Sequence, residues 1–117
     1  MIVDDDRIMV SLLQTLLELD GFDVVNVMRG LQVVDKARKE KPDLIMMDYH
    51  LADTSGLDVI RSLRGLPEFA GLPILVASGM NVETEVLKAG ANEFMVKPMD
   101  TNKLASTLRR LIDSAPA

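Results

Sequence analysis

Leu44-Ile-Met-Met-Asp48-Tyr-His-Leu-Ala-Asp-Thr-Ser-Gly56 is a run of four apolar residues that ends at a carboxylate and continues into a polar turn. An apolar run of this length between turn signals is typical of a strand that is buried on both faces of a sheet. A charged residue at the end of such a strand belongs at the rim of the sheet, where open α/β folds bind their ligands. Asp48 is therefore the first candidate for a functional residue.

The composition is that of one globular domain. The chain has 117 residues, of which 48% are hydrophobic and 26% are charged. We expect a single domain over residues 1–117, with residues 113–117 as a tail or the start of a linker. The net charge of −5 argues against direct nucleic-acid binding. No apolar run is long enough to cross a membrane, and the lack of cysteine excludes disulfides and thiolate metal sites, so we expect a cytoplasmic protein.

The chain alternates short strands with helices. Apolar and β-branched runs predict strands at residues 1–3, 23–27, 44–47, 73–77 and 94–96, and helical periodicity predicts helices near residues 8–19, 31–41, 55–65, 82–89 and 100–112. This alternation implies parallel strands joined by right-handed crossovers. We therefore predict an α/β fold, a flavodoxin-like doubly wound sheet of five parallel strands in the order 2-1-3-4-5 with helices on both faces.

Apolar periodicity and capping residues predict how the helices begin, end and pack. The buried stripe of the first helix should be Ile8, Met9, Leu12, Leu13 and Leu16, and that of the second Leu31, Val34 and Ala37. The third helix should bury Leu57, Ile60 and Leu63, and the last helix Leu104, Leu108, Leu111 and Ile112. Helix starts are predicted at Asp6, Ser55 and Asp100, and helix ends before Gly21, Gly65 and Gly90.

Four of the five predicted strands end in polar or charged residues. These are Asp4 and Asp5, Asp48, Ser78, and Lys97. Because the carboxyl ends of parallel strands meet at one edge of a sheet, these side chains should converge there. Two carboxylates about 4 Å apart repel by roughly 4 kcal/mol at an effective dielectric constant of about 20. A cluster of oxygen ligands that is open to water suits Mg²⁺. Aspartate often begins loops, but that preference does not explain a hydroxyl and an ammonium at the same edge.

The joint spacing of these strand-end motifs resembles that of the receiver domain of two-component response regulators. The motifs are Val3-Asp4-Asp5, Met47-Asp48, Ala77-Ser78 and Val96-Lys97-Pro98, and the likeness covers the whole chain. The resemblance implies a single receiver domain in which Asp48 is the phosphoacceptor. Asp48 would take a phosphoryl group from a histidine kinase or a phosphotransfer protein and become an aspartyl phosphate. Beyond its own phosphorylation and dephosphorylation, such a domain is not an enzyme.

The resemblance also assigns the ligands of a cation. Asp5 and Asp48 would bind Mg²⁺ directly, Asp4 would bind it through water, and the backbone carbonyl of His50 would be a further ligand. Mn²⁺ is the expected substitute. The imidazole of His50 is not expected to be a ligand, because a lone histidine seldom binds a metal and Mg²⁺ prefers oxygen.

Two further roles follow from the resemblance. Lys97 would contact one phosphoryl oxygen as a point charge, and the hydroxyl of Ser78 would donate to another. Ser78 would then draw Phe94 inward, and the fourth helix, fifth strand and fifth helix would carry the signal to a partner, to a fused effector or to a second copy in a homodimer. The alternative is that Phe94 is an ordinary core aromatic, Ser78 a turn residue and Lys97 a solvated charge.

The sequence departs from the receiver pattern at three places. Ser78 replaces the commoner threonine, and Ala52 stands where many relatives have proline. The segment 78–90 is about one helical turn shorter than usual, so the fourth helix should have only about two turns.

Two other classes of function compete with a phosphorylated receiver. A pseudo-receiver would share the fold and act as a protein-interaction module without phosphorylation. A flavodoxin-like or phosphatase-type enzyme would require a glycine-rich phosphate loop or a second catalytic acid, and the sequence contains neither.

Overall fold

The sheet is parallel throughout, and its strand order is β2-β1-β3-β4-β5, as predicted. The computed structural model describes residues 1–115. Its strands are β1 (Ile2–Val3), β2 (Asn26–Val27), β3 (Ile45–Asp48), β4 (Ile74–Ser78) and β5 (Glu93–Val96). Its helices are α1 (Arg7–Leu19), α2 (Val33–Glu40), α3 (Gly56–Arg64), α4 (Glu83–Ala89) and α5 (Thr101–Asp113), with 3-10 turns η1 (Gly30–Gln32) and η2 (Pro67–Phe69). This is the predicted flavodoxin-like, doubly wound arrangement.

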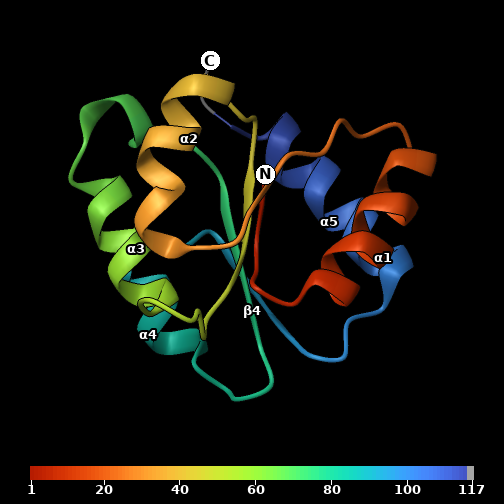
Figure 1. Cartoon of the computed structure of the whole chain (residues 1–117). Coiled ribbons are helices and arrows are strands. Elements are labelled where there is room, and N and C mark those ends of the chain that lie inside the picture. Colours follow the sequence, from red (N-terminus) through yellow and green to blue (C-terminus); the bar gives the residue numbers. More distant parts are fainter. Residues whose placement is uncertain (116–117) are drawn as a thin grey trace.

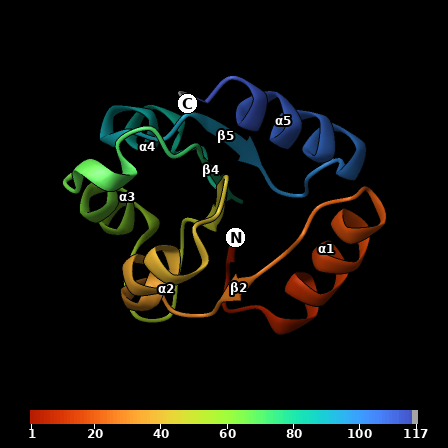
Figure 2. The same cartoon turned by 90° about the horizontal axis from the view of Figure 1, so that it is seen from above.

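Helices cover both faces of the sheet (Figure 1). Figure 2 shows α2, α3 and α4 on one side of the sheet and α1 and α5 on the other. The apolar cluster beneath α2, α3 and α4 contains Met47 and Val76, whereas the cluster beneath α1 and α5 contains Met46 and Leu75. Neighbouring residues of one strand thus enter opposite cores, and the central strands are buried on both faces, as their continuous apolar sequence predicts.

The buried face of α1 differs from the predicted stripe. Ile8 is 85% exposed and Leu12 is 54% exposed, whereas Val10, Leu13 and Leu17 are buried. At about 3.6 residues per turn, the line through Val10, Leu13 and Leu17 is rotated from the predicted one toward the sheet and α5. The prediction was wrong for Ile8 and Leu12 and right for Leu13. Because α1 carries apolar residues on both lines, periodicity alone does not identify the side that faces the core.

The prediction for α2 was wrong at its first residue. Leu31 lies in η1 rather than in the helix and is 76% exposed, while Val33 and Ala37 are fully buried and Val34 is half-buried. The 3-10 turn has about three residues per turn, whereas the helix has about 3.6. A helical period counted from Leu31 therefore does not identify the residues of α2 that face the core.

The predicted helix signals are confirmed at most positions. The carboxylates of Asp6 and Asp100 and the hydroxyl of Ser55 accept hydrogen bonds from main-chain N–H groups in the first turns of α1, α5 and α3. Gly21 and Gly90 follow α1 and α4 with φ values of 92° and 119°, where a side chain would be strained. The capping residues therefore determine where these helices begin and end.

Several element boundaries differ from the predicted ranges. β2 is limited to Asn26–Val27, although Ile2 N–H also donates to Val25 O at 2.8 Å. α4 has seven residues, the expected two turns. α5 extends through Asp113, so this part of the predicted tail is helical, and residues 116–117 of that tail lie outside the described residues. Within residues 1–115, no helix is both long enough and apolar enough to span a membrane.

Candidate functional site

The strand-end residues gather at the carboxyl edge of the sheet. Asp48 is the last residue of β3 and pairs with Ala77 of β4, so Ser78 lies one residue farther along the neighbouring strand. Ser78 in turn pairs with Val96 of β5, and Lys97 follows directly. Val3 of β1 pairs with Met47, so the residues that follow four strands meet at one edge, as the sequence predicts.

Three carboxylates form a cluster at this edge. Asp4, Asp5 and Asp48 each offer an oxygen atom, and these atoms lie within 4.8 Å of one another. Asp4 is buried with 5% exposure, Asp48 is half-buried, and Asp5 is exposed. The cluster therefore has a buried floor and one side open to solvent. All three offered atoms are carboxylate oxygens, and this donor set fits a hard divalent cation such as Mg²⁺ better than a soft metal.

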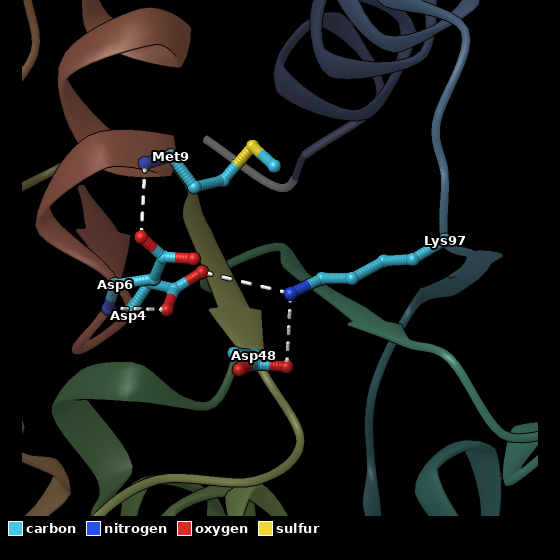
Figure 3. Close-up of polar contacts among 5 residues, drawn as sticks. All are labelled: Asp4, Asp6, Met9, Asp48 and Lys97. Carbon is cyan, nitrogen blue, oxygen red and sulfur yellow. Dashed lines mark hydrogen bonds and ion pairs between the residues drawn. The ribbon is translucent and has the colours of Figure 1, made fainter.

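Lys97 is the cation that the structure brings to the cluster. Its Nζ lies 3.3 Å from Oδ1 of Asp48 and 3.7 Å from Oδ2 of Asp4. Figure 3 shows the lysine side chain reaching across to both carboxylates. Its main-chain N–H donates to Ser78 O at 2.9 Å, and the Lys97–Pro98 peptide bond is cis. One ammonium among three carboxylates leaves an excess of negative charge, which favours binding of a further cation.

Burial has the largest effect on the pKa of Asp4. Removal from water raises the pKa of this carboxyl above its ordinary value. The Asp6 N–H, which donates to Asp4 Oδ1 at 3.0 Å, and the Lys97 ammonium both oppose the rise, whereas the charge of Asp48 adds to it. The hydrogen bond and the nearby ammonium therefore offset part of this rise, and a divalent cation would favour the negative form of Asp4 further.

Ser78 is fully enclosed, with 1% exposure. Its Oγ accepts a hydrogen bond from the Met80 N–H at 3.1 Å. A hydroxyl that accepts one bond still has its own proton to donate. Among the described residues, no hydrogen bond links Ser78 to the carboxylate cluster. The hydroxyl is thus held beside the site by the chain that leaves β4.

His50 and Phe94 lie outside the carboxylate cluster. The His50 side chain is exposed and its ring packs edge-on against Tyr49, with ring centroids 5.0 Å apart. Its main chain forms a β-bridge with Ser55, which joins the backbone two residues after Asp48 to the start of α3. Phe94 is half-buried, pairs with Val76 and packs against the core beneath α2, α3 and α4.

One contact near the site was not predicted from the sequence. Both carboxylate oxygens of Asp53 accept main-chain hydrogen bonds, from Gly30 N–H at 2.9 Å and from Leu31 N–H at 3.0 Å. Asp53 belongs to the loop after β3, whereas Gly30 and Leu31 begin η1. Along the chain, Asp53 is 23 residues from Gly30 and 22 residues from Leu31. In the sequence alone, Asp53 is indistinguishable from an ordinary turn residue.

Comparison with known proteins agrees with this geometry. Residues 1–109 match the family described as "Response regulator receiver domain". The chain is 28% identical to the polar-differentiation response regulator DivK of Brucella anthropi, over 98% of this chain and 96% of that protein. It is 31% identical to the phosphate regulon transcriptional regulatory protein PhoB of Rhizobium meliloti, over 97% of this chain but only 52% of PhoB.

A solved structure extends the likeness to three dimensions. The receiver domain of the sensor histidine kinase PA1611 from Pseudomonas aeruginosa superimposes with a TM-score of 0.87 and 28% identity, covering 97% of this chain and 95% of that one. That structure has a magnesium ion coordinated in its active-site cleft. The fold, the strand-end residues and these matches define a signalling domain of two-component systems. The chain belongs to the response regulator receiver domain family.

Proposed function

We propose that Asp48 accepts a phosphoryl group from the phosphohistidine of a histidine kinase or of a phosphotransfer protein. The observation that carries this proposal is the position of the Lys97 ammonium, 3.3 Å from Asp48 and 3.7 Å from Asp4. A positive charge beside the nucleophile and an acidic cluster around it are what phosphoryl transfer to a carboxylate requires, since catalysis there is mainly positioning and charge neutralisation. We place the domain in the cytoplasm and assign residues 1–117 to one receiver domain, with residues 113–117 as a tail or the start of a linker.

The transfer step is a direct displacement at phosphorus. An oxygen of the Asp48 carboxylate forms the new P–O bond while the P–N bond to the donor histidine breaks, and the electron pair of that bond stays on the imidazole. Lys97 neutralises charge on one phosphoryl oxygen, and the hydroxyl of Ser78 donates a hydrogen bond to another. The half-buried position of Asp48 limits access of water to the acyl phosphate.

The acidic cluster is the proposed site of the cation. Asp5 and Asp48 hold Mg²⁺ directly, Asp4 holds it through water, and the carbonyl of His50 supplies a further oxygen, with Mn²⁺ as the substitute. Two observations support this assignment: the three clustered carboxylates of this chain, and the magnesium ion in the PA1611 receiver. The bound cation would neutralise developing charge on the phosphoryl oxygens.

Phosphorylation would switch the face formed by α4, β5 and α5. Ser78 would move toward the phosphoryl group, and Phe94 would follow into the space that Ser78 leaves. The half-buried position of Phe94 supports this step, because the ring packs against the core and is not fully enclosed by it. The altered face would then bind a downstream partner, a fused effector or a second copy of the domain.

The test is to incubate the protein with Mg²⁺ and acetyl phosphate and to measure its intact mass. We expect the wild type to gain one phosphoryl group and Asp48→Asn to gain none. Asp23→Asn is the matched control, because Asp23 is an exposed aspartate just before β2, at the opposite edge of the sheet. If the wild type gains nothing, the chain is a binding module with a receiver fold rather than a phosphoacceptor.

A further inference from the structure

The loop between β3 and α3 is closed on itself. The Gly56 N–H donates to Tyr49 O at 2.6 Å, the Leu51 N–H donates to Thr54 O at 3.2 Å, and His50 bridges to Ser55. Gly56 lies so close to the chain leaving β3 that a Cβ there would come within 3.0 Å of Asp48 O. Residues 49–56 therefore form a small hairpin whose base lies at Asp48 and whose tip carries Asp53.

The tip of this hairpin is fastened to η1. No side chain within η1 caps its start, and the Asp53 carboxylate supplies the missing acceptors, one oxygen for the Gly30 N–H and one for the Leu31 N–H. Hydrogen bonds of this kind, from main-chain N–H groups to a charged acceptor, are stronger than neutral ones. The hairpin is thus held at both ends, by β3 at its base and by Asp53 at its tip.

The packing at Gly30 shows how closely the two segments approach. Gly30 is buried, and a Cβ at this position would lie 2.9 Å from Leu51 Cδ1 and 2.9 Å from Val59 Cγ2, and would collide with Thr54 Cγ2. A side chain at residue 30 would therefore force Thr54 and Leu51 of the hairpin, and Val59 of α3, to shift. Two independent features, a glycine and a carboxylate, keep the hairpin in one position.

We infer that Asp53 is a positioning residue for the proposed cation site. This inference rests on the proposed function, because the hairpin that Asp53 holds also carries the His50 carbonyl, one of the proposed ligands. Without the contact to η1 the hairpin keeps its base but loses its support, and the ligand carbonyl samples other positions. Removal of a group that supports a metal ligand typically lowers metal affinity by about 10- to 100-fold.

The test is a Mg²⁺ titration of four variants. Tyr49 is the only tyrosine in a chain without tryptophan and lies beside Asp48, so its fluorescence reports on the site. Asp53→Ala should weaken Mg²⁺ binding by about 10-fold, the lower end of that range, because Asp53 acts through the loop. Asp53→Asn, which loses the same charge but keeps one acceptor oxygen, should bind more tightly than Asp53→Ala. Gly30→Ala keeps the charge and should show a comparable loss, whereas the exposed control Asp23→Ala should match the wild type.

Comparing the Mg²⁺ affinity with the phosphorylation rate at saturating Mg²⁺ distinguishes a positioning role of Asp53 from a general loss of structure. At saturating Mg²⁺, the rate of phosphorylation of Asp53→Ala by acetyl phosphate should return close to that of the wild type, with an unchanged circular dichroism spectrum. Equal Mg²⁺ affinity of Asp53→Ala and Asp23→Ala would overturn the inference, as would tight binding by Gly30→Ala. If Asp53→Ala does not fold, Asp53→Asn and Gly30→Ala provide the same comparison. A wild type that binds Mg²⁺ but accepts no phosphoryl group would overturn the proposed function alone.

Discussion

The ammonium of Lys97, directly after β5, lies 3.3 Å from Oδ1 of Asp48 at the end of β3. Because β4 lies between these strands, the lysine side chain must extend across one strand to reach the carboxylate. The side chains of Lys97 and Asp48 are 28% and 15% exposed, so solvent screens this pair less than it screens a surface pair.

Replacing Lys97 should separate phosphorylation from cation binding. Lys97→Met keeps a long, unbranched side chain but removes its charge, and phosphorylation by acetyl phosphate should slow by roughly 10²-fold because one charge-stabilising donor is lost. Mg²⁺ affinity should not fall, since the ammonium competes with the cation for Asp48 and Asp4. Lys103→Met, at an exposed position in α5, is the control. Phosphorylation of Lys97→Met at the wild-type rate would exclude a role for this charge.

The orientation of α1 can be tested with two neighbouring leucines. Leu13 is 4% exposed, whereas Leu12 is 54% exposed. Leu13→Ala should therefore lower the free energy of unfolding by about 3 kcal/mol through lost burial and a cavity. Leu12→Ala should change it by no more than about 0.5 kcal/mol. Urea unfolding of both variants makes the comparison, and a larger loss for Leu12→Ala would mean that the helix faces the other way.

These leucines also mark the limit of what the sequence could predict. The parallel sheet and the convergence of Asp4, Asp48 and Lys97 were predictable, because alternating strands and helices favour a parallel sheet and such a sheet brings its strand ends together. The buried face of α1 was not, because Ile8 and Leu12 on its outer side are as apolar as the residues on its inner side. The helical period gives the spacing of the apolar residues in α1, but only packing against α5 and the sheet determines which side of the helix is buried.

The contact between Asp53 and η1 was unpredictable for a different reason. It depends on the conformation of a loop and on a close approach at Gly30, and neither leaves a periodic signal in the sequence. A turn aspartate and a loop glycine are both common residues in such segments. Their partnership becomes visible only when the tertiary structure brings the two loops together.

Arg64 at the end of α3 should matter more for stability than Arg61 on the same helix. Arg64 donates from Nε to Gly90 O at 2.9 Å, and from its two terminal nitrogens to Phe69 O at 2.6 Å and Asn92 Oδ1 at 2.9 Å. It thereby ties α3 to the turn at η2 and to the connection between α4 and β5. Arg64 is half-buried, and this burial lowers the pKa of its guanidinium below the ordinary value.

A lysine at residue 64 cannot make all three contacts, because its ammonium is a single point rather than a planar fork. Arg64→Lys should lower the free energy of unfolding by about 2 kcal/mol, as hydrogen bonds from a charged donor to partly buried acceptors are lost. Arg61→Lys is the control, since Arg61 is 65% exposed and its ion pair with Asp58, at 3.7 Å, contributes little. Equal effects of the two changes in urea unfolding would contradict the proposed anchoring by Arg64.

Asp53 should also make the stability of the domain depend on pH in a defined direction. The hydrogen bonds from the Leu31 and Gly30 N–H groups hold the pKa of this carboxyl below its ordinary value of 3.8. The folded protein therefore binds this proton less readily than the unfolded chain does. The resulting stabilisation is fully present above the ordinary pKa and is lost as the pH falls through the lower pKa of the folded state.

The comparison of wild type with Asp53→Asn isolates this effect, because the asparagine side chain does not titrate. Near neutral pH the wild type should have the higher free energy of unfolding, and the difference should shrink below pH 3.8 as Asp53 becomes protonated in the unfolded chain and then in the folded domain. Urea unfolding of both proteins at neutral pH and at about pH 3 measures the difference in free energy of unfolding at each pH. A difference between wild type and Asp53→Asn that stays constant into acid would mean that the two main-chain hydrogen bonds do not stabilise the charged carboxylate.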